Sequence, residues 1–76
     1  MSVIVYSTPS CPYCTMVKDF LKKKQIPFED YDVSRDQRRA EEMVRKSGQM
    51  GVPVTDINGR ILVGYRPNEI EGALRR

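Results

Sequence analysis

The stretch Cys11-Pro12-Tyr13-Cys14 follows a short apolar run, Val3-Ile4-Val5-Tyr6, and opens a helical pattern that extends to Lys24. Its two cysteines are the only ones in the chain. Thiols three positions apart at the start of a helix lie about one turn from each other, so they can close a small disulfide and reopen it. Beside a β-α-β pattern, this spacing indicates a dithiol redox motif.

The residues on either side of the motif predict the first β-α-β unit. The continuous apolar run at 3–6 is typical of a central strand that is buried on both faces. The segment from Phe28 to Val33 carries three acids, which favours an edge strand. Because a single helix joins the two strands, we expect them to be parallel. Gln25-Ile26-Pro27 should end that helix.

The remainder of the chain predicts a helix, a hairpin and a last helix. Ser34-Arg35-Asp36-Gln37 has the form of a capping box for a second helix, which should run through Lys46 and stop at Gly48. Asn58-Gly59 lies between the strand patterns 54–57 and 60–63 and predicts a type I′ turn. A short helix should begin at Pro67. The expected element order is β-α-β-α-β-β-α.

Helical spacing predicts which side chains each helix buries. In the first helix, Lys18, Lys22 and Lys23 should face water, and the charged residues of the second helix should form a solvated face. The expected buried residues are Tyr13, Met16, Val17, Phe20 and Leu21 in the first helix, Ala40, Met43 and Val44 in the second, and Ile70, Ala73 and Leu74 in the third.

Composition restricts the classes of function. With 76 residues, the chain is expected to form one domain, 1–76. It has no histidine, which excludes imidazole chemistry, and one pair of cysteines cannot complete a tetrahedral zinc site without a second copy of the chain. The net charge is +3, and the run Lys22-Lys23-Lys24 complements the dipole at the end of a helix, so we expect no nucleic-acid partner.

No apolar run approaches the ~20 residues of a membrane span, so we expect no membrane contact. The first strand begins within a few residues of Met1, which argues against a signal peptide and favours a cytoplasmic location.

The chemistry of the motif depends on the thiolate, which is the reactive form of cysteine. At the start of a helix, unpaired N–H groups point toward Cys11 and favour its thiolate, whereas Cys14 is one turn further in and should be shielded. Cys11 would attack a substrate disulfide, and Cys14 would then attack Cys11 to release the reduced substrate. The alternatives are two inert buried cysteines or a metal pair.

Cys-Pro-Tyr-Cys after a strand and a Ser/Thr-Pro loop resembles the glutaredoxins, and so does Gly48-Gln49-x-x-Val52-Pro53 before a hairpin. The similarity covers essentially the whole chain. It implies a thioredoxin-like α/β fold, with a four-stranded mixed sheet and helices on both faces. It also implies that Cys11 is the nucleophile and that Cys14 is the resolving cysteine.

The same resemblance implies that the Val52-Pro53 bond is cis and lies against the cysteine motif, where the backbone of Val52 would pair with an extended substrate. Tyr13 is expected to face the substrate. The residues expected to bind substrate are Pro12, Tyr13, Val52, Pro53, Gly64 and Tyr65.

Two departures from the family pattern concern the reductant. Glutaredoxins that use glutathione typically carry a lysine before the first cysteine, where this chain has Thr8 and Ser10. They also carry Gly-Gly and an acidic pair where this chain has Val63-Gly64-Tyr65-Arg66-Pro67. The latter resembles Gly-Phe-Arg-Pro of NrdH-type redoxins, which supply electrons to ribonucleotide reductase and are recharged by thioredoxin reductase. Those proteins usually have another dipeptide between their cysteines.

We therefore expect a monomeric thiol–disulfide oxidoreductase with no bound cofactor. Its partners would be protein or mixed disulfides, with glutathione or thioredoxin reductase as the external reductant and ribonucleotide reductase as a candidate acceptor. One alternative is a dimeric module that shares zinc or a [2Fe–2S] cluster, and another is an interaction domain with inert cysteines. Asp56 is unusual in a central strand. It is interpreted as either a partly exposed carboxylate near the strand end or a buried acid with a raised pKa that assists proton transfer or holds a polar contact.

Overall fold

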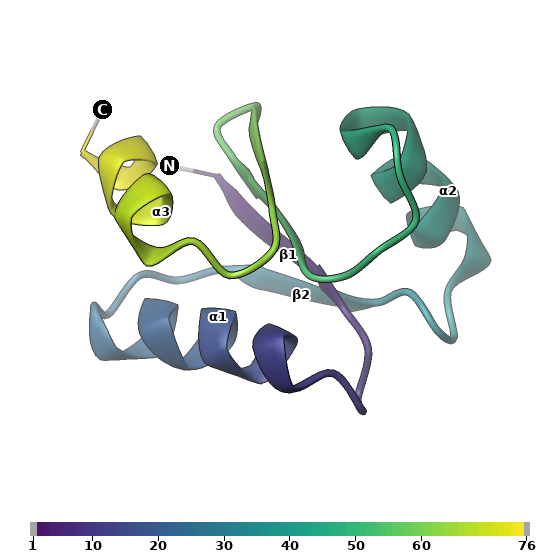
Figure 1. Cartoon of the computed structure of the whole chain (residues 1–76), viewed down its shortest axis with the longest axis horizontal. Coiled ribbons are helices and arrows are strands. Elements are labelled where there is room, and N and C mark those ends of the chain that lie inside the picture. The colour runs from purple at the N-terminus through teal and green to yellow at the C-terminus, as the bar shows by residue number, and fades with distance from the viewer. Residues whose placement is uncertain (1, 76) are drawn as a thin grey trace.

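A mixed four-stranded sheet organises the chain, and the computed structural model describes residues 2–75 of it (Figure 1). The strands lie in the order β2-β1-β3-β4. β1 pairs with β2 in parallel, and the pairs β1–β3 and β3–β4 are antiparallel. The element order is the predicted one: β1 (Val3–Ser7), α1 (Pro12–Lys23), β2 (Glu29–Asp32), α2 (Gln37–Ser47), β3 (Val54–Ile57), β4 (Arg60–Val63) and α3 (Pro67–Leu74).

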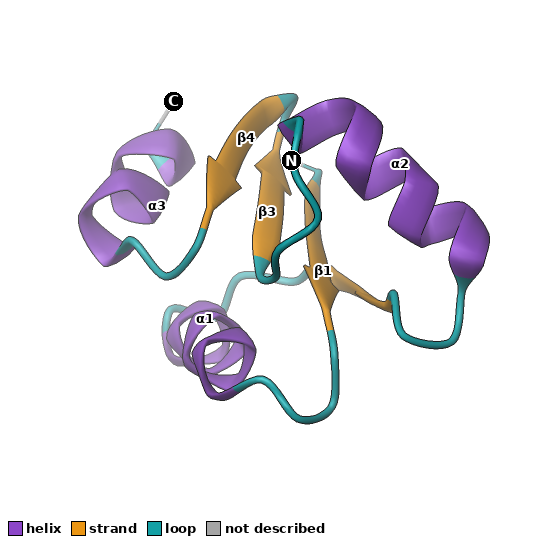
Figure 2. Cartoon of the chain, turned by 45° about the vertical axis from the view of Figure 1, so that its right-hand side comes forward, coloured by secondary structure: helices purple, strands orange, loops and turns teal. Residues whose placement is uncertain are grey.

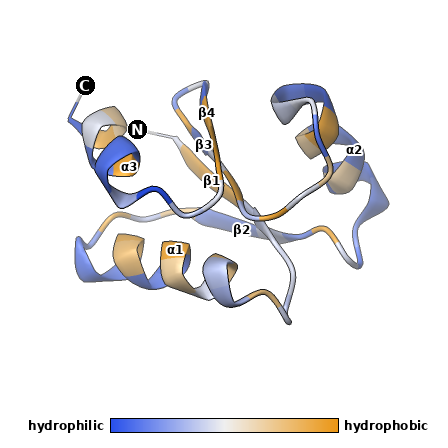
Figure 3. Ribbon diagram, viewed as in Figure 1, coloured by the Kyte–Doolittle hydropathy of each residue, from blue (hydrophilic) through white to orange (hydrophobic). Residues whose placement is uncertain are grey.

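The apolar run of β1 lies in the middle of the sheet, as its composition predicts, between β2 and β3. β2 is an edge strand, and its acidic residues make it the most hydrophilic strand of the sheet (Figure 3). Its free edge therefore carries charges, which disfavour pairing with another chain. The prediction of an edge strand parallel to the first is confirmed.

Helices cover both faces of the sheet, as predicted (Figure 2). α1 and α3 lie on one face, where Val17, Leu21 and Ile70 pack against side chains of β1, β3 and β4. α2 lies on the other face, where Met43 packs against Tyr6 and Val54. No helix within residues 2–75 has the length and the apolar character needed to cross a membrane.

The buried stripe of α1 differs from the predicted one. It consists of Cys14, Val17 and Leu21, with Phe20 at its margin. Tyr13 and Met16 are exposed, and the prediction that they are buried is wrong. The stripe is rotated because the small side chain of Cys14, rather than the tyrosine beside it, faces the sheet. In α2, Met43 is buried as predicted, but Val44 is exposed.

The second helix begins later than its capping-box pattern predicts. Asp36 is the N-cap residue, and its Oδ1 accepts a hydrogen bond from the N–H of Arg39 at 3.2 Å. Ser34 instead donates from its hydroxyl to Asp32 at 2.5 Å, within the turn that follows β2. Aspartate is as favourable as serine at the N-cap position of a helix, so Asp36 can cap the helix in place of Ser34. Gly48 ends the helix with φ 76°, as predicted.

The hairpin between β3 and β4 forms as predicted. Asn58 and Gly59 both have positive φ, 53° and 93°, which a type I′ turn requires of its two central residues. The N–H of Gly59 also donates to Oδ1 of Asp56 at 2.7 Å. This hairpin, with the strand β1 beside it, places the Val52-Pro53 loop opposite the start of α1.

Candidate active site

Cys11 is the N-cap residue of α1. Its backbone is extended, with φ −97° and ψ 111°, and its Sγ accepts a hydrogen bond from the N–H of Cys14 at 3.2 Å. Pro12 occupies the first helical position, where its missing N–H leaves no hydrogen bond unmade. The sulfur is thus held at the positive end of the helix dipole, and it is partly exposed. A reactant in solution can therefore reach this sulfur.

Cys14 is fully buried beneath Cys11. Burial, with a smaller contribution from the neighbouring Cys11, raises the pKa of its thiol to about 12, and the backbone N–H of Thr8 and the charge of Lys18 oppose this rise. At neutral pH, the thiol of Cys14 is therefore protonated. The predicted difference in exposure between the two cysteines is confirmed.

The loop before β3 brings its backbone to the cysteines. The Val52-Pro53 bond is cis, as the resemblance implied. The carbonyl oxygen of Val52 lies 3.9 Å from Sγ of Cys11, which donates to it when protonated. Pro53 is buried and Val52 is half-buried. A segment 41 residues away in sequence thus flanks the candidate nucleophile.

A groove of about 550 Å³ opens beside the helix start and the cis bond. It contains five of the six residues that were predicted to bind substrate; Pro12 does not line it. Tyr13 contributes its exposed ring, and Tyr65 is held by an edge-to-face contact with Phe20, with the ring centroids 6.5 Å apart. The lining residues are Tyr13, Val52, Pro53, Val63, Gly64, Tyr65 and Arg66.

Val63 and Arg66 line the groove although the sequence did not single them out as binding residues. Val63 alternates with the buried Leu62 along β4, so its outward direction could have been read from the strand period. Arg66 donates from Nε to the carbonyl of Val63 at 3.1 Å and from Nη1 to Glu69 at 3.1 Å. It is the single charged side chain among the residues that line the groove.

Lys18 lies one helical turn beyond Cys14 and does not face water as predicted. Its Nζ donates to Oδ2 of Asp30 at 2.9 Å and to the hydroxyl of Ser7 at 3.5 Å, and 23% of its side chain is exposed. Ser7 is buried and donates to Oδ1 of Asp30 at 2.7 Å. The cluster of Ser7, Lys18 and Asp30 joins α1, β1 and β2 next to the buried thiol.

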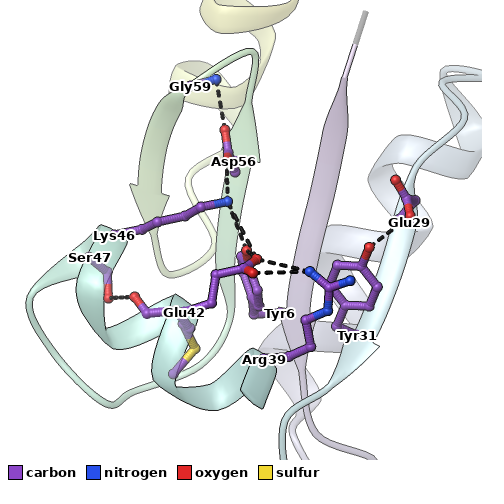
Figure 4. Close-up of polar contacts among 10 residues, drawn as sticks. Tyr6, Glu29, Tyr31, Arg39, Glu42, Lys46, Ser47, Asp56 and Gly59 are labelled. Carbon is purple, nitrogen blue, oxygen red and sulfur yellow. Dashed lines mark hydrogen bonds and ion pairs between the residues drawn. The ribbon is translucent and has the colours of Figure 1, made fainter. Parts of the chain in front are cut away.

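Asp56 is buried in β3, so the interpretation as a partly exposed carboxylate is wrong. It faces α2, where Lys46 donates to its Oδ2 at 2.7 Å (Figure 4). Lys46 also donates to the hydroxyl of Tyr6 at 2.8 Å, and that hydroxyl donates to Glu42. Glu42 therefore lies in a polar network against the sheet rather than on a solvated face. Asp56 is therefore part of this polar network and does not line the groove.

The family model "Glutaredoxin" matches residues 3–62 of the chain. The chain belongs to the glutaredoxin family. The match covers both cysteines, the cis bond and the hairpin, so the resemblance predicted from the two motifs is confirmed. Members of this family are thiol-dependent redox proteins.

The relatives of this glutaredoxin-family chain include an "uncharacterized glutaredoxin-like 8.6 kDa protein in rubredoxin operon" of Clostridium pasteurianum. The two sequences are 44% identical over 72 residues, which cover 95% of this chain and 96% of the relative. The chain thus matches a protein of nearly its own length.

Two solved structures show the fold. The thioredoxin-like protein BC3987 superposes with a TM-score of 0.89 at 26% identity, over 95% of this chain and 99% of the other. NrdH-redoxin from Escherichia coli superposes with a TM-score of 0.85 at 26% identity, over 95% and 93%. NrdH-redoxin is a glutaredoxin-like protein with a thioredoxin-like activity profile. The thioredoxin-like fold is therefore confirmed.

Within residues 2–75, no three or more of the side chains of cysteine, aspartate and glutamate gather where they could hold a metal ion. What the described residues do bring together is an accessible sulfur, a buried sulfur one turn below it, a carbonyl oxygen and a mostly apolar groove. This set is suited to thiol–disulfide exchange.

Proposed function

We propose that the chain is a dithiol–disulfide oxidoreductase that reduces protein or mixed disulfides. The thiolate of Cys11 attacks one sulfur of the substrate disulfide, the other substrate sulfur leaves with the electron pair and takes up a proton, and a mixed disulfide forms on Cys11. Cys14 then loses its proton and attacks Sγ of Cys11. The substrate's second sulfur leaves as a thiolate, and Cys11 and Cys14 are left as a disulfide.

The observation that carries this proposal is the hydrogen bond from the N–H of Cys14 to Sγ of Cys11 at the N-terminus of α1. It holds the first sulfur at an accessible position at the positive end of the helix dipole, and the second sulfur lies one turn away, out of reach of solvent. The difference in exposure between Cys11 and Cys14 would have no use if both cysteines were inert.

The groove supports an extended polypeptide as the substrate. Its lining includes two tyrosines and the residues of the cis bond, and the backbone of Val52 would pair with a strand-like segment. Side chains of the substrate would then contact Tyr13 and Tyr65, whose large rings provide apolar area with a polar end.

The proposed reductant is argued from the charges that line the groove. Glutathione carries two carboxylates and an ammonium group, and these need partners in the groove. Arg66 is the one charged residue of the groove lining, and Glu69 already pairs with it. This favours recharging by thioredoxin reductase, a protein partner, over recharging by glutathione. The structural likeness to NrdH-redoxin supports the same assignment, and with it ribonucleotide reductase as an acceptor to be tested.

The test measures NADPH consumption while the protein reduces a protein disulfide such as insulin. Two recycling systems are compared. One contains glutathione and glutathione reductase, and the other contains thioredoxin reductase without thioredoxin. Cys11→Ser serves as the inactive control. Cys14→Ser should still attack the substrate but should remain trapped as a mixed disulfide, which mass spectrometry detects.

Turnover with thioredoxin reductase alone supports the NrdH-type assignment, whereas turnover with glutathione alone makes glutathione the reductant despite its missing charge partners. Full turnover by the Cys11→Ser variant would overturn the assignment of the nucleophile. Absence of a mixed disulfide with both single-cysteine variants would overturn the proposed function as a whole.

A further inference from the structure

The resolving step poses a problem that the geometry of Cys14 creates. A thiol attacks only as its thiolate, and Cys14 is a buried thiol whose pKa is raised to about 12 in the free dithiol. At neutral pH, nearly all of such a group is therefore protonated. The step that releases the substrate therefore requires the surroundings of Cys14 to favour its thiolate more strongly once the mixed disulfide has formed.

Formation of the mixed disulfide removes part of the obstacle. In the free dithiol, Cys11 opposes the ionisation of Cys14, both through its hydrogen bond and through its charge. A sulfur bonded to the substrate is neutral, so both contributions disappear. Burial then opposes the thiolate, and two groups favour it: the backbone N–H of Thr8 and the ammonium group of Lys18.

Lys18 is fixed in the position where its charge can act. The side chain lies on the same face of α1 as Cys14, four residues further on, because residues at this spacing are neighbours on a helix. Asp30 at 2.9 Å and Ser7 at 3.5 Å hold its Nζ at the carboxyl end of β1. Ser7 directly precedes Thr8, so both groups that favour the Cys14 thiolate lie near the carboxyl end of β1.

We propose that Lys18, held by Asp30 and Ser7, is a positioning residue that stabilises the thiolate of Cys14 while Cys14 attacks the mixed disulfide on Cys11. This proposal rests on the dithiol mechanism above. Lys18 neither gains nor loses a proton in the step. The proton of Cys14 goes to solvent, the Cys14–Cys11 bond forms, and the bond from Cys11 to the substrate sulfur breaks.

The charged groups around Cys14 come from three elements. Cys11 lies above it at the start of α1, Lys18 lies below it on the same helix, and Asp30 approaches from β2 through Lys18. Asp30 bears the opposite charge, but its two oxygens are taken up by Lys18 and Ser7. The carboxylate thereby orients the cation.

The size of the expected effect follows from general electrostatics. Removing a nearby cation raises the pKa of a thiol by about one unit or more. One unit lowers the thiolate fraction about tenfold at neutral pH. The remaining thiolate is about threefold more nucleophilic, because nucleophilicity rises with pKa. The net loss in the resolving rate at pH 7 is therefore about threefold, and it shrinks as the pH approaches the pKa of Cys14.

The experiment uses Lys18→Gln, which removes the charge but retains a hydrogen-bond donor for Asp30, and Lys18→Arg, which restores the charge. Lys22→Gln, one turn further along the exposed face, is the matched control. In the first measurement, each variant is combined with Cys11→Ser, and the pKa of Cys14 is followed by the ¹³Cβ chemical shift. Lys18→Gln should raise this pKa by about one unit, and Lys18→Arg should return it to the parent value.

The second measurement is stopped-flow reaction with 5,5′-dithiobis(2-nitrobenzoate) as a function of pH. Cys11 releases the first chromophore and Cys14 releases the second. Lys18→Gln should leave the first phase unchanged and slow the second about threefold at pH 7, with the deficit vanishing at high pH. Damage to the fold would instead lower the rate at every pH.

The possible outcomes distinguish a failure of the proposed function from a failure of the inference about Lys18. If the first phase is absent in the parent protein, the proposed function fails. If both phases occur but Lys18→Gln changes neither the pKa of Cys14 nor the pH profile of the second phase, the inference about Lys18 fails alone. An equal shift with Lys22→Gln would also overturn it, since the effect would then be a general one of net charge.

Discussion

Lys46 of α2 donates to Oδ2 of Asp56 in β3 at 2.7 Å, and this ion pair joins the helix to the middle of the sheet (Figure 4). Asp56 lies opposite Ile4 and Ile61 in the sheet register, a position where an apolar side chain would ordinarily face the helix. The pair is extended through Tyr6 to Glu42. The carboxylate of Asp56 is tolerated in a central strand because Lys46 of α2 neutralises its charge.

Removing Lys46 should destabilise the protein markedly. Lys46→Met leaves the carboxylate of Asp56, of whose side chain 11% is exposed, without a cation. Breaking a largely buried ion pair on one side costs about 2–3 kcal/mol at a site that keeps some access to solvent. The free energy of unfolding from urea denaturation at pH 7 should fall by this amount.

The double variant Lys46→Met/Asp56→Leu should recover most of that loss, because an apolar pair of similar volume avoids the desolvation of both charges. Glu69→Gln is the control, since the Arg66–Glu69 pair is exposed and its loss should cost less than about 0.5 kcal/mol. A single Lys46→Met variant as stable as the parent would show that the pair contributes nothing to the attachment of α2.

Acid should weaken the same network at Glu42. The hydrogen bond from the hydroxyl of Tyr6 is the main cause that lowers the pKa of Glu42 below 4.5, and Arg39 and Lys46 add to it. A carboxyl whose folded pKa lies below its unfolded value contributes stability above the unfolded value, and this contribution is lost as the pH falls through the folded pKa. Stability should therefore decline below about pH 4.5. In Glu42→Gln, the decline measured by urea denaturation from pH 7 to pH 3 should be shallower, and an unchanged slope would contradict the assignment.

Thr55→Val should stabilise the protein. Oγ1 of Thr55 is buried and has no hydrogen-bond partner within residues 2–75, and its neighbours in the register are Val5 and Leu62. An unpaired buried hydroxyl is costly, so replacing it with a methyl group should raise the free energy of unfolding by about 1 kcal/mol. Chemical denaturation of the two proteins side by side measures this. A loss of stability would show that the hydroxyl has a hydrogen-bond partner in solution.

The element order was predictable because each element carries a local signal. The β-α-β unit, the Asn58-Gly59 turn and the stop at Gly48 follow from backbone preferences that act within a few residues. The groove was predictable in part, because the spacing of the cysteines and the Val52-Pro53 dipeptide resemble a known family. Residues such as Pro53 and Gly64 were placed by that resemblance and not by their own chemistry.

Most of the unpredicted features depend on contacts between segments that are separated in the sequence. Lys18 and Lys46 look like solvated lysines in the sequence, and their partners, Asp30 and Asp56, are 12 and 10 residues away. The sheet register brings them together, and no local pattern encodes that register for charged residues. The exposure of Tyr13 also depends on how α1 packs on the sheet. At this turn of the helix, Cys14 faces the sheet and Tyr13 faces solvent.

Tyr13 provides the last prediction, which concerns substrate binding. Its ring is 60% exposed and forms one wall of the groove, so a bound polypeptide would cover it. Covering a ring of this size is worth about 1–1.4 kcal/mol, which corresponds to about a five- to tenfold change in binding. Tyr13→Ala should therefore raise the KM for a protein disulfide about five- to tenfold.

The rate with a small aromatic disulfide should change little in Tyr13→Ala, because a small molecule reaches Sγ of Cys11 without filling the groove. Met50→Ala is the matched control: its side chain is 81% exposed, lies two residues before Val52 and does not line the groove. It should leave both rates unchanged. An equal loss with the protein and the small substrate would mean that Tyr13 supports the cysteines themselves, since a contact made only by a large substrate cannot affect a small one.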